Sequence, residues 1–155
     1  MNRFLTLSVA CALLLAACGD DAEESPAETQ EQAQEPAAAT VEVASSPLGD
    51  IIVDSEGMTL YMFVPDQEQN GEPTCYDECA DAWPALEAAG EPTAGEGLDQ
   101  SLLGTAERTD GTTQVTYNNL PLHNFSGDEA AGDTNGQGLM DIWWVVSPDG
   151  NPVME

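Results

Sequence analysis

The stretch LYMFVPD at residues 60–66 reappears as LHNFSGD at residues 122–128. Each copy has a ring-bearing residue, phenylalanine two positions later and aspartate three positions after that. The six positions are Tyr61, Phe63 and Asp66 in the first copy, and His123, Phe125 and Asp128 in the second. Residues two apart on a strand share one face. Each copy therefore predicts a buried ring pair, followed by an aspartate that accepts hydrogen bonds from N–H groups of the next loop.

Short apolar segments separated by turn residues surround both copies. We expect strands over residues 48–54 and 58–64, joined as a hairpin, and a strand on each side of the Asp110-Gly111 turn. Residues 121–125 and the apolar, aromatic run at 141–147 predict two further strands. The segment at 75–90 is the one expected helix, and Pro84 should break it.

The two halves of this region can be laid over each other. Leu48-Gly49 corresponds to Leu103-Gly104, and the turn at 55–57 corresponds to the turn at 109–111, with an inserted strand before the second copy of the motif. Trp83 and Trp143 follow the two copies. We therefore expect a mainly β fold: a small pseudo-symmetric domain from two degenerate repeats of short antiparallel strands, with one short helical segment near the cysteine pair.

Several motifs in this order resemble a family of bacterial lipoproteins known as the secreted repeat of unknown function. They are DSEGMTLYMFVPD at 54–66, the Cys75 to Leu86 segment, RTDGTTQVTYNNLPLHNFSGD at 108–128, GDTNGQG at 132–138 and WWVVSPDG at 143–150. The family motif opens with tyrosine, whereas the second copy here has His123. The resemblance implies an exported, anchored repeat protein and implies no reaction.

The first 46 residues have a different character from the rest. Residues 1–17 combine Arg3 with an apolar run and predict a lipoprotein signal peptide. Leu15-Ala16-Ala17-Cys18 resembles the lipobox, in which the signal is cut before the cysteine and its thiol is acylated. Residues 18–46 are acidic, rich in alanine and glutamine and free of aromatic residues, which predicts a disordered tether. The folded domain is then expected over 47–155, exported and held by Cys18 at the membrane lipid or envelope surface.

The charge of the chain is strongly negative. It carries 29 acidic residues against two basic ones, a formal net charge of −27 over 155 residues. Such a surface repels nucleic-acid phosphates, so nucleic acid is excluded as a partner. Solubility in a salty environment and a cation-binding surface both fit the composition.

Cys75 and Cys79 remain once Cys11 leaves with the signal and Cys18 is acylated. In an exported chain this pair predicts a local disulfide. A copper or redox site is the alternative, with the two thiolates and His123 as soft ligands.

A calcium loop is a further hypothesis for the residues after the first motif. Asp66, Glu68 and Asn70 offer oxygen atoms at alternating positions, Gly71 stands sixth and Asp77 twelfth. The missing preceding helix and the closing aspartate in place of glutamate weigh against it. Calcium or copper are thus the only cofactors that the sequence raises.

The function expected from these features is binding or scaffolding rather than catalysis. The chain has one histidine and none of the common hydrolase motifs, so no enzyme activity is predicted. An envelope protein is the expected kind of partner, besides the membrane lipid. The alternative is a metal-binding or redox accessory protein of the cell envelope.

Overall fold

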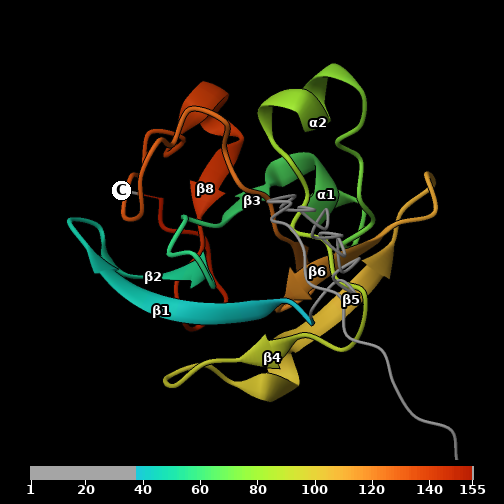
Figure 1. Cartoon of the computed structure of the whole chain (residues 1–155). Helices are drawn as coiled ribbons and strands as arrows, with labels where there is room; N and C mark the ends of the chain where they lie inside the picture. The colour runs from blue at the N-terminus through green and yellow to red at the C-terminus, as the bar shows by residue number, and fades with distance from the viewer. Residues whose placement is uncertain (1–37, 155) are drawn as a thin grey trace, which may run out of the picture. The chain divides into compact units, whose positions relative to one another are not determined.

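The computed structural model describes residues 38–154 (Figure 1). The predicted signal peptide, Cys18 and most of the predicted tether lie outside these residues. In chain order the elements are β1 Thr40–Ser46, β2 Gly49–Asp54, β3 Tyr61–Phe63, α1 Val64–Glu68, α2 Glu78–Ala82, β4 Thr93–Ala94, the 3-10 turn Gln100–Leu102, β5 Leu103–Glu107, β6 Thr113–Tyr117, β7 Leu120–Pro121, the 3-10 turn Leu139–Asp141 and β8 Trp143–Val145.

The expected mainly β fold with short helices is confirmed. The strands form three small sheets, in the orders β2-β1-β4, β3-β8 and β5-β6-β7. In Figure 1 the long β1–β2 hairpin crosses the lower part of the domain, and β3 and β8 lie above it. No helix in the described range 38–154 is long and apolar enough to cross a bilayer.

The predicted start of the domain at residue 47 is too late. Thr40–Ser46 forms β1, which pairs antiparallel with β2 along its full length and parallel with β4. Val41 is fully buried in the core, and Val43 lies on the same side of the strand. The sequence predicts a tether here because the two alternating valines directly follow an alanine-rich acidic stretch, whose composition masks the strand pattern.

The predicted hairpin of residues 48–54 with 58–64 is confirmed only beside its turn. β2 pairs with β1, and β3 pairs antiparallel with β8, far along the chain. The two predicted strands are joined only beside the turn, where Val53 and Thr59 form an antiparallel bridge. There Asp54 N–H donates to the Met58 carbonyl, and Leu60 N–H donates to the Ile52 carbonyl. The residues after β3 form α1, because Pro65 is well placed at the start of a helix.

The inclusion of β1 changes the correspondence of the halves. Each half now consists of a hairpin followed by the motif: β1–β2 before the first copy and β5–β6 before the second. The second half therefore has no inserted strand, and Leu48-Gly49 does not correspond to Leu103-Gly104. Ile52 and Val115 are the matching positions, because the carbonyl of each accepts from the leucine that precedes the motif ring. Leu60 N–H donates to Ile52, and Leu122 N–H donates to Val115.

The predicted helix at 75–90 is confirmed only in its first part. α2 ends at Ala82, and the residues after Pro84 run extended instead of continuing the helix. As a result, this extended segment bonds to β6: Val115 N–H donates to the Leu86 carbonyl. This segment corresponds to Val146 after β8, which accepts from Ile52 N–H in the same way.

Candidate functional site

The two copies of the motif meet at their first residues. Tyr61 and His123 form an antiparallel bridge, in which the N–H of each donates to the carbonyl of the other at 2.8 and 2.9 Å. Both side chains are fully buried. The first residues of the two copies therefore lie inside the domain, at the contact between its two halves.

Each ring pairs with the aspartate of the other copy. The Tyr61 hydroxyl donates to Asp128 Oδ2 at 2.7 Å. The His123 Nε2 lies 3.0 Å from Asp66 Oδ2, within hydrogen-bond distance of that carboxyl group. Each hydrogen-bonded pair therefore joins the ring of one copy to the aspartate of the other, so that each copy needs the other to complete its hydrogen bonds.

The second oxygen of each aspartate holds the loop that follows its own motif. Asp66 Oδ1 accepts from both the backbone N–H and the hydroxyl of Thr74, at 2.7 and 2.6 Å. Asp128 Oδ1 accepts from the backbone N–H of Asn135 at 2.8 Å. This confirms that the motif aspartates accept from loop N–H groups. Thr74 and Asn135 were not predicted, although their offsets from the aspartates differ by only one residue.

Four aromatic rings stack in one row through this centre. Phe63 stacks on Trp143, Trp143 on Trp83, and Trp83 on Phe125, with centroid distances of 4.1, 3.9 and 4.2 Å. The order alternates between the halves. Tyr61 meets the edge of this row at Trp83 and Phe125.

His123 occupies the matching place on the row, at Trp143 and Phe63. Each ring contact of one half has its counterpart in the other half: Tyr61 with Trp83 corresponds to His123 with Trp143. The contact of the two tryptophans with each other is its own counterpart. The six motif residues and two tryptophans thus form a pseudo-two-fold core, with Tyr61 and His123 next to its axis. Edge-to-face and offset contacts of this kind are favourable beyond the area they bury.

The histidine side is tied further into the fold than the tyrosine side. His123 Nδ1 lies 3.3 Å from the Trp83 carbonyl, and Gln114 Nε2 lies 3.2 Å from Nε2. Gln114 also donates to the Leu122 carbonyl and accepts from Arg108. Sequence reasoning did not identify Gln114, because a lone glutamine on a strand carries no motif signal.

Arg108 connects this network to the cysteine loop. Its guanidinium donates to the Cys75 carbonyl and to Gln114 Oε1, both at 2.8 Å, and its Nε donates to Asp110 at 3.2 Å. The guanidinium also lies 4.4 Å from the centre of the Tyr76 ring. A buried arginine needs such a set of partners, and this one holds residues 75–76 against β5 and β6.

Cys75 and Cys79 form a disulfide, as predicted. The sulfur atoms are therefore not available as thiolates, and the copper hypothesis loses two of its ligands. His123 instead lies with Asp66, Gln114 and the Trp83 carbonyl. The disulfide spans the start of α2 and pins the loop that Arg108 contacts.

The calcium hypothesis also fails on geometry. Asp66 lies inside α1, fully buried, and directs its oxygens to Thr74 and His123. Glu68 and Asp77 are exposed. Over residues 38–154, no group of three histidine, cysteine or acidic side chains is placed to hold a metal ion. Asp66, Glu68, Asn70 and Asp77 therefore do not form the predicted loop site.

Burial shapes the protonation of the tyrosine–aspartate pair. Desolvation, together with the hydrogen bond to Asp128 and its charge, raises the pKa of Tyr61 far above its usual value. Desolvation also raises the pKa of Asp128, against the opposing effect of hydrogen bonds from Tyr61 and Asn135. Tyr61 is thus held as a neutral donor, and its oxygen accepts from Gly136 N–H at 3.2 Å.

The chain matches one family model twice, over residues 42–87 and 104–147. No curated protein and no solved structure matches it. Each matched segment begins in the first strand of a hairpin, β1 or β5, and runs past the motif, so the matches coincide with the two structural halves. Together they cover more than half of the chain, which therefore belongs to the family described as a secreted repeat of unknown function.

Proposed function

We propose that this chain is an exported lipoprotein whose two-repeat domain serves as a binding or scaffolding module at the membrane surface. In this proposal acyl chains on Cys18 hold the protein to the lipid, and residues 19–37 separate the domain from it. The partner is a protein of the cell envelope. The description of the family as secreted and the disulfide both fit an oxidising compartment outside the cytoplasm.

The reciprocal pairing of the motif residues carries the proposal. The only histidine of the chain and the two aspartates of the motif are buried. Each of them forms a hydrogen bond with a motif residue of the other half. Over residues 38–154, every fully buried side-chain nitrogen and oxygen has a hydrogen-bond partner. A chain that uses its chemically versatile residues to join two halves is suited to offer a fixed surface rather than to perform a reaction.

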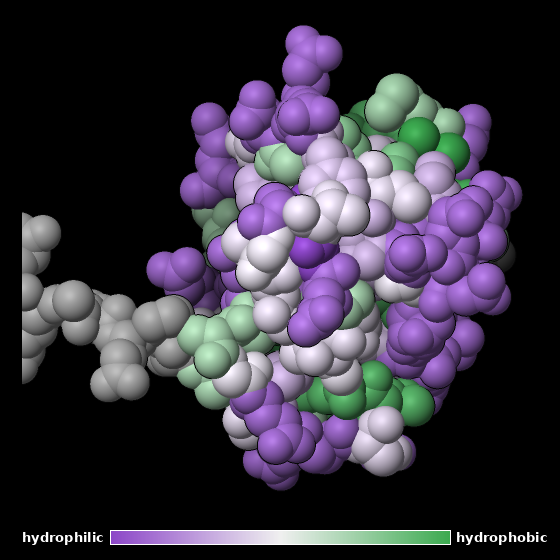
Figure 2. Space-filling view, turned by 90° about the vertical axis from the view of Figure 1, so that its right-hand side faces the viewer, coloured by the Kyte–Doolittle hydropathy of each residue, from purple (hydrophilic) through white to green (hydrophobic). Residues whose placement is uncertain are grey.

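That surface is dominated by polar side chains. Figure 2 shows the right-hand side of Figure 1 as mostly hydrophilic, with smaller patches of hydrophobic residues between. The excess of acidic residues favours partners with basic segments and excludes nucleic acid.

Lipid attachment is tested with single cysteine variants of the full chain, produced in a bacterial host with a labelled fatty acid. The unchanged chain should carry the label and sediment with membranes. Cys18→Ala should lose both, whereas Cys11→Ala, a matched change in the same region, should keep both. Label on the Cys18→Ala protein, or none on the unchanged chain, would refute the anchor.

The binding role is tested by placing a photo-crosslinking amino acid at exposed positions on different parts of the domain, such as Glu56, Glu96, Thr105 and Met154. We expect a protein adduct of defined mass at one position or at neighbouring ones, and none at the others. Adducts of equal intensity at every position, or no adduct at any, would contradict a binding module.

A further inference from the structure

One strand of the domain has an edge that no other strand covers. β5 lies at the end of the sheet β5-β6-β7 and pairs with β6 alone in the described part of the chain. An uncovered edge presents backbone N–H and C=O groups in the spacing of a strand, and extended peptides bind proteins by completing such a sheet.

The register shows which groups of β5 face outward. Val115 donates to Leu86 and Thr113 accepts from Ala88, so the main-chain groups of these two residues point away from β5. Their partners across the pair are Thr105 and Glu107. In an antiparallel ladder, residues in such pairs direct their N–H and C=O to the outer edges. Thr105 and Glu107 therefore offer their backbone groups to a further strand.

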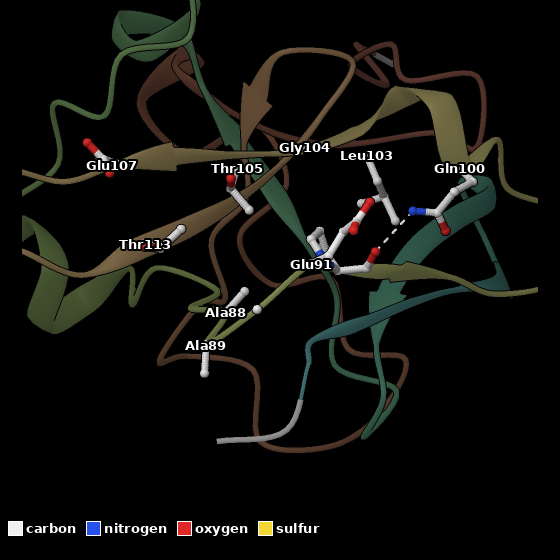
Figure 3. A pocket seen from close by; sticks show the side chains of 11 residues that line it. Ala88, Ala89, Glu91, Gln100, Leu103, Gly104, Thr105, Glu107 and Thr113 are labelled. Carbon is white, nitrogen blue, oxygen red and sulfur yellow. Dashed lines mark hydrogen bonds between the residues drawn. The ribbon is translucent and has the colours of Figure 1, made fainter. Parts of the chain in front are cut away.

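A groove of about 580 Å³ runs beside this strand (Figure 3). Its walls are β5 and the segment at 88–92, and β6 lies between them at Thr113, because Ala88 bonds to the edge of β6 that faces away from β5. The groove therefore lies over one face of β5 and β6, where the small side chains of Ala88 and Ala89 leave room. Gln100 closes one end and holds the 88–92 segment through the Pro92 carbonyl at 3.0 Å. A strand added at the outer edge of β5 would lie outside the groove, and long side chains on the same face of that strand would reach over β5 into it.

Two carboxylates give this groove its charge. In Figure 3, Glu107 lies at the left, at the last residue of β5, and Glu91 lies near Leu103, the first residue of the strand. Both residues are exposed, and neither forms an ion pair with any residue between 38 and 154. Basic side chains on the strand partner would meet both of them.

From these observations we propose that β5 and the adjoining groove bind an extended, basic segment of a partner protein as an added strand. The charge decides against the other occupants: a second copy of this chain would bring its own excess of acid, and the segment at 19–37 contains no basic residue. This inference rests on the proposed binding role and names its surface and the chemistry of the partner.

The test uses the purified chain carrying Cys18→Ala and a short, capped synthetic peptide of alternating lysine and threonine. We expect saturable binding, with the largest amide chemical-shift changes at residues 103–107. The same peptide with glutamate in place of lysine should not bind. A lysine–threonine peptide methylated on alternate backbone nitrogens should bind about tenfold more weakly, because it lacks main-chain donors.

Variants of β5 separate strand addition from general attraction to an acidic surface. Thr105→Pro removes one outward N–H and should weaken binding about tenfold, whereas Thr105→Ala keeps it and should stay within about twofold. Glu91→Gln with Glu107→Gln should weaken binding several-fold and reduce its salt dependence. Glu56→Gln, an exposed acid elsewhere, should leave binding unchanged.

The proposal is overturned if the peptide does not bind, if Glu56→Gln weakens it as much as the groove variants, or if the chain dimerises through β5 in sedimentation. If Thr105→Pro does not unfold cooperatively, the shift map and the glutamate variants decide instead. Crosslinks to a partner through other faces, with no peptide bound at β5, would refute this surface and leave the binding role standing. The absence of any partner adduct in cells would refute the binding role itself.

Discussion

Tyr61 and His123 exchange two main-chain hydrogen bonds across the contact of the two halves, and each side chain then reaches the aspartate of the other copy. The motif is therefore a device for joining two repeats. One copy alone would leave a buried ring donor and a buried carboxylate without their partners, at a cost of about 1–3 kcal/mol for each group. This accounts for the presence of the motif in pairs.

The pseudo-symmetry predicts that tyrosine can replace the histidine. In His123→Tyr the hydroxyl should reach Asp66 as Tyr61 reaches Asp128, and the free energy of unfolding should fall by about 1 kcal/mol or less. His123→Phe leaves the buried Asp66 Oδ2 without its donor and should lose about 2–3 kcal/mol. Urea unfolding of the three proteins measures the difference. Equal losses in both variants would show that the two sides of the axis are not equivalent.

Much of this centre could be predicted from the sequence, and the part that could not depends on long-range pairing. The spacing of Tyr61, Phe63 and Asp66 identified the equivalent residues in the second copy, and Trp83 and Trp143 were identified as counterparts. The exchange of partners could not be foreseen, because it depends on which strands bridge. Local patterns fix the face of a strand but not its neighbour.

The missed strand has a local cause. Thr40–Ser46 follows directly on a long run of acidic residues, alanine and proline, and its valines are too few to stand out from that composition. Its partner β2 was recognised, and a hairpin needs a second strand nearby. The strand that the sequence shows as an insertion in the second half has β1 as its counterpart in the first half.

Tyr61 should resist ionisation as long as the domain is folded. Its pKa is raised in the folded state, so this residue stabilises the fold fully below the unfolded value of about 10, and that stability is lost as the pH rises further. The absorbance of phenolate should therefore contain a step that coincides with alkaline unfolding. Tyr61→Phe should lack that step and should lose about 1–2 kcal/mol at neutral pH. Tyr76→Phe, which changes a less buried ring, should retain it.

Gly136 should not tolerate a side chain. A Cβ at this position would lie 2.7 Å from the Trp83 ring and 2.9 Å from the Tyr61 ring, in the middle of the aromatic centre. We expect Gly136→Ala to lower the free energy of unfolding by about 1–3 kcal/mol. Gly90→Ala is the matched control, because its Cβ meets nothing within 4 Å and should change stability by less than about 0.5 kcal/mol. A tolerated Gly136→Ala would contradict the close packing of this centre.

The disulfide should contribute modestly to stability. It closes a very short loop, for which the loss of chain entropy in the unfolded state predicts about 2 kcal/mol. Cys75→Ala with Cys79→Ala should therefore fold and unfold cooperatively at a lower urea concentration. Titration of the purified Cys18→Ala chain should find neither Cys75 nor Cys79 as a free thiol before reduction. Free thiols at these positions in the folded, unreduced protein would revive the copper hypothesis.

Asp128 should make stability depend on pH in the opposite direction from an ordinary paired carboxylate. Burial raises its pKa, so the folded protein holds this proton more tightly than the unfolded chain. The resulting stabilisation is complete below the unfolded pKa of about 3.9 and is lost as the pH rises through the folded value. Asp128→Asn cannot titrate. The stability of the unchanged protein relative to Asp128→Asn should therefore fall across this interval, once the effect of Asp149→Asn, an exposed acid, has been subtracted. A relative stability that rises with pH would mean that the hydrogen bonds from Tyr61 and Asn135 outweigh the desolvation of this carboxyl.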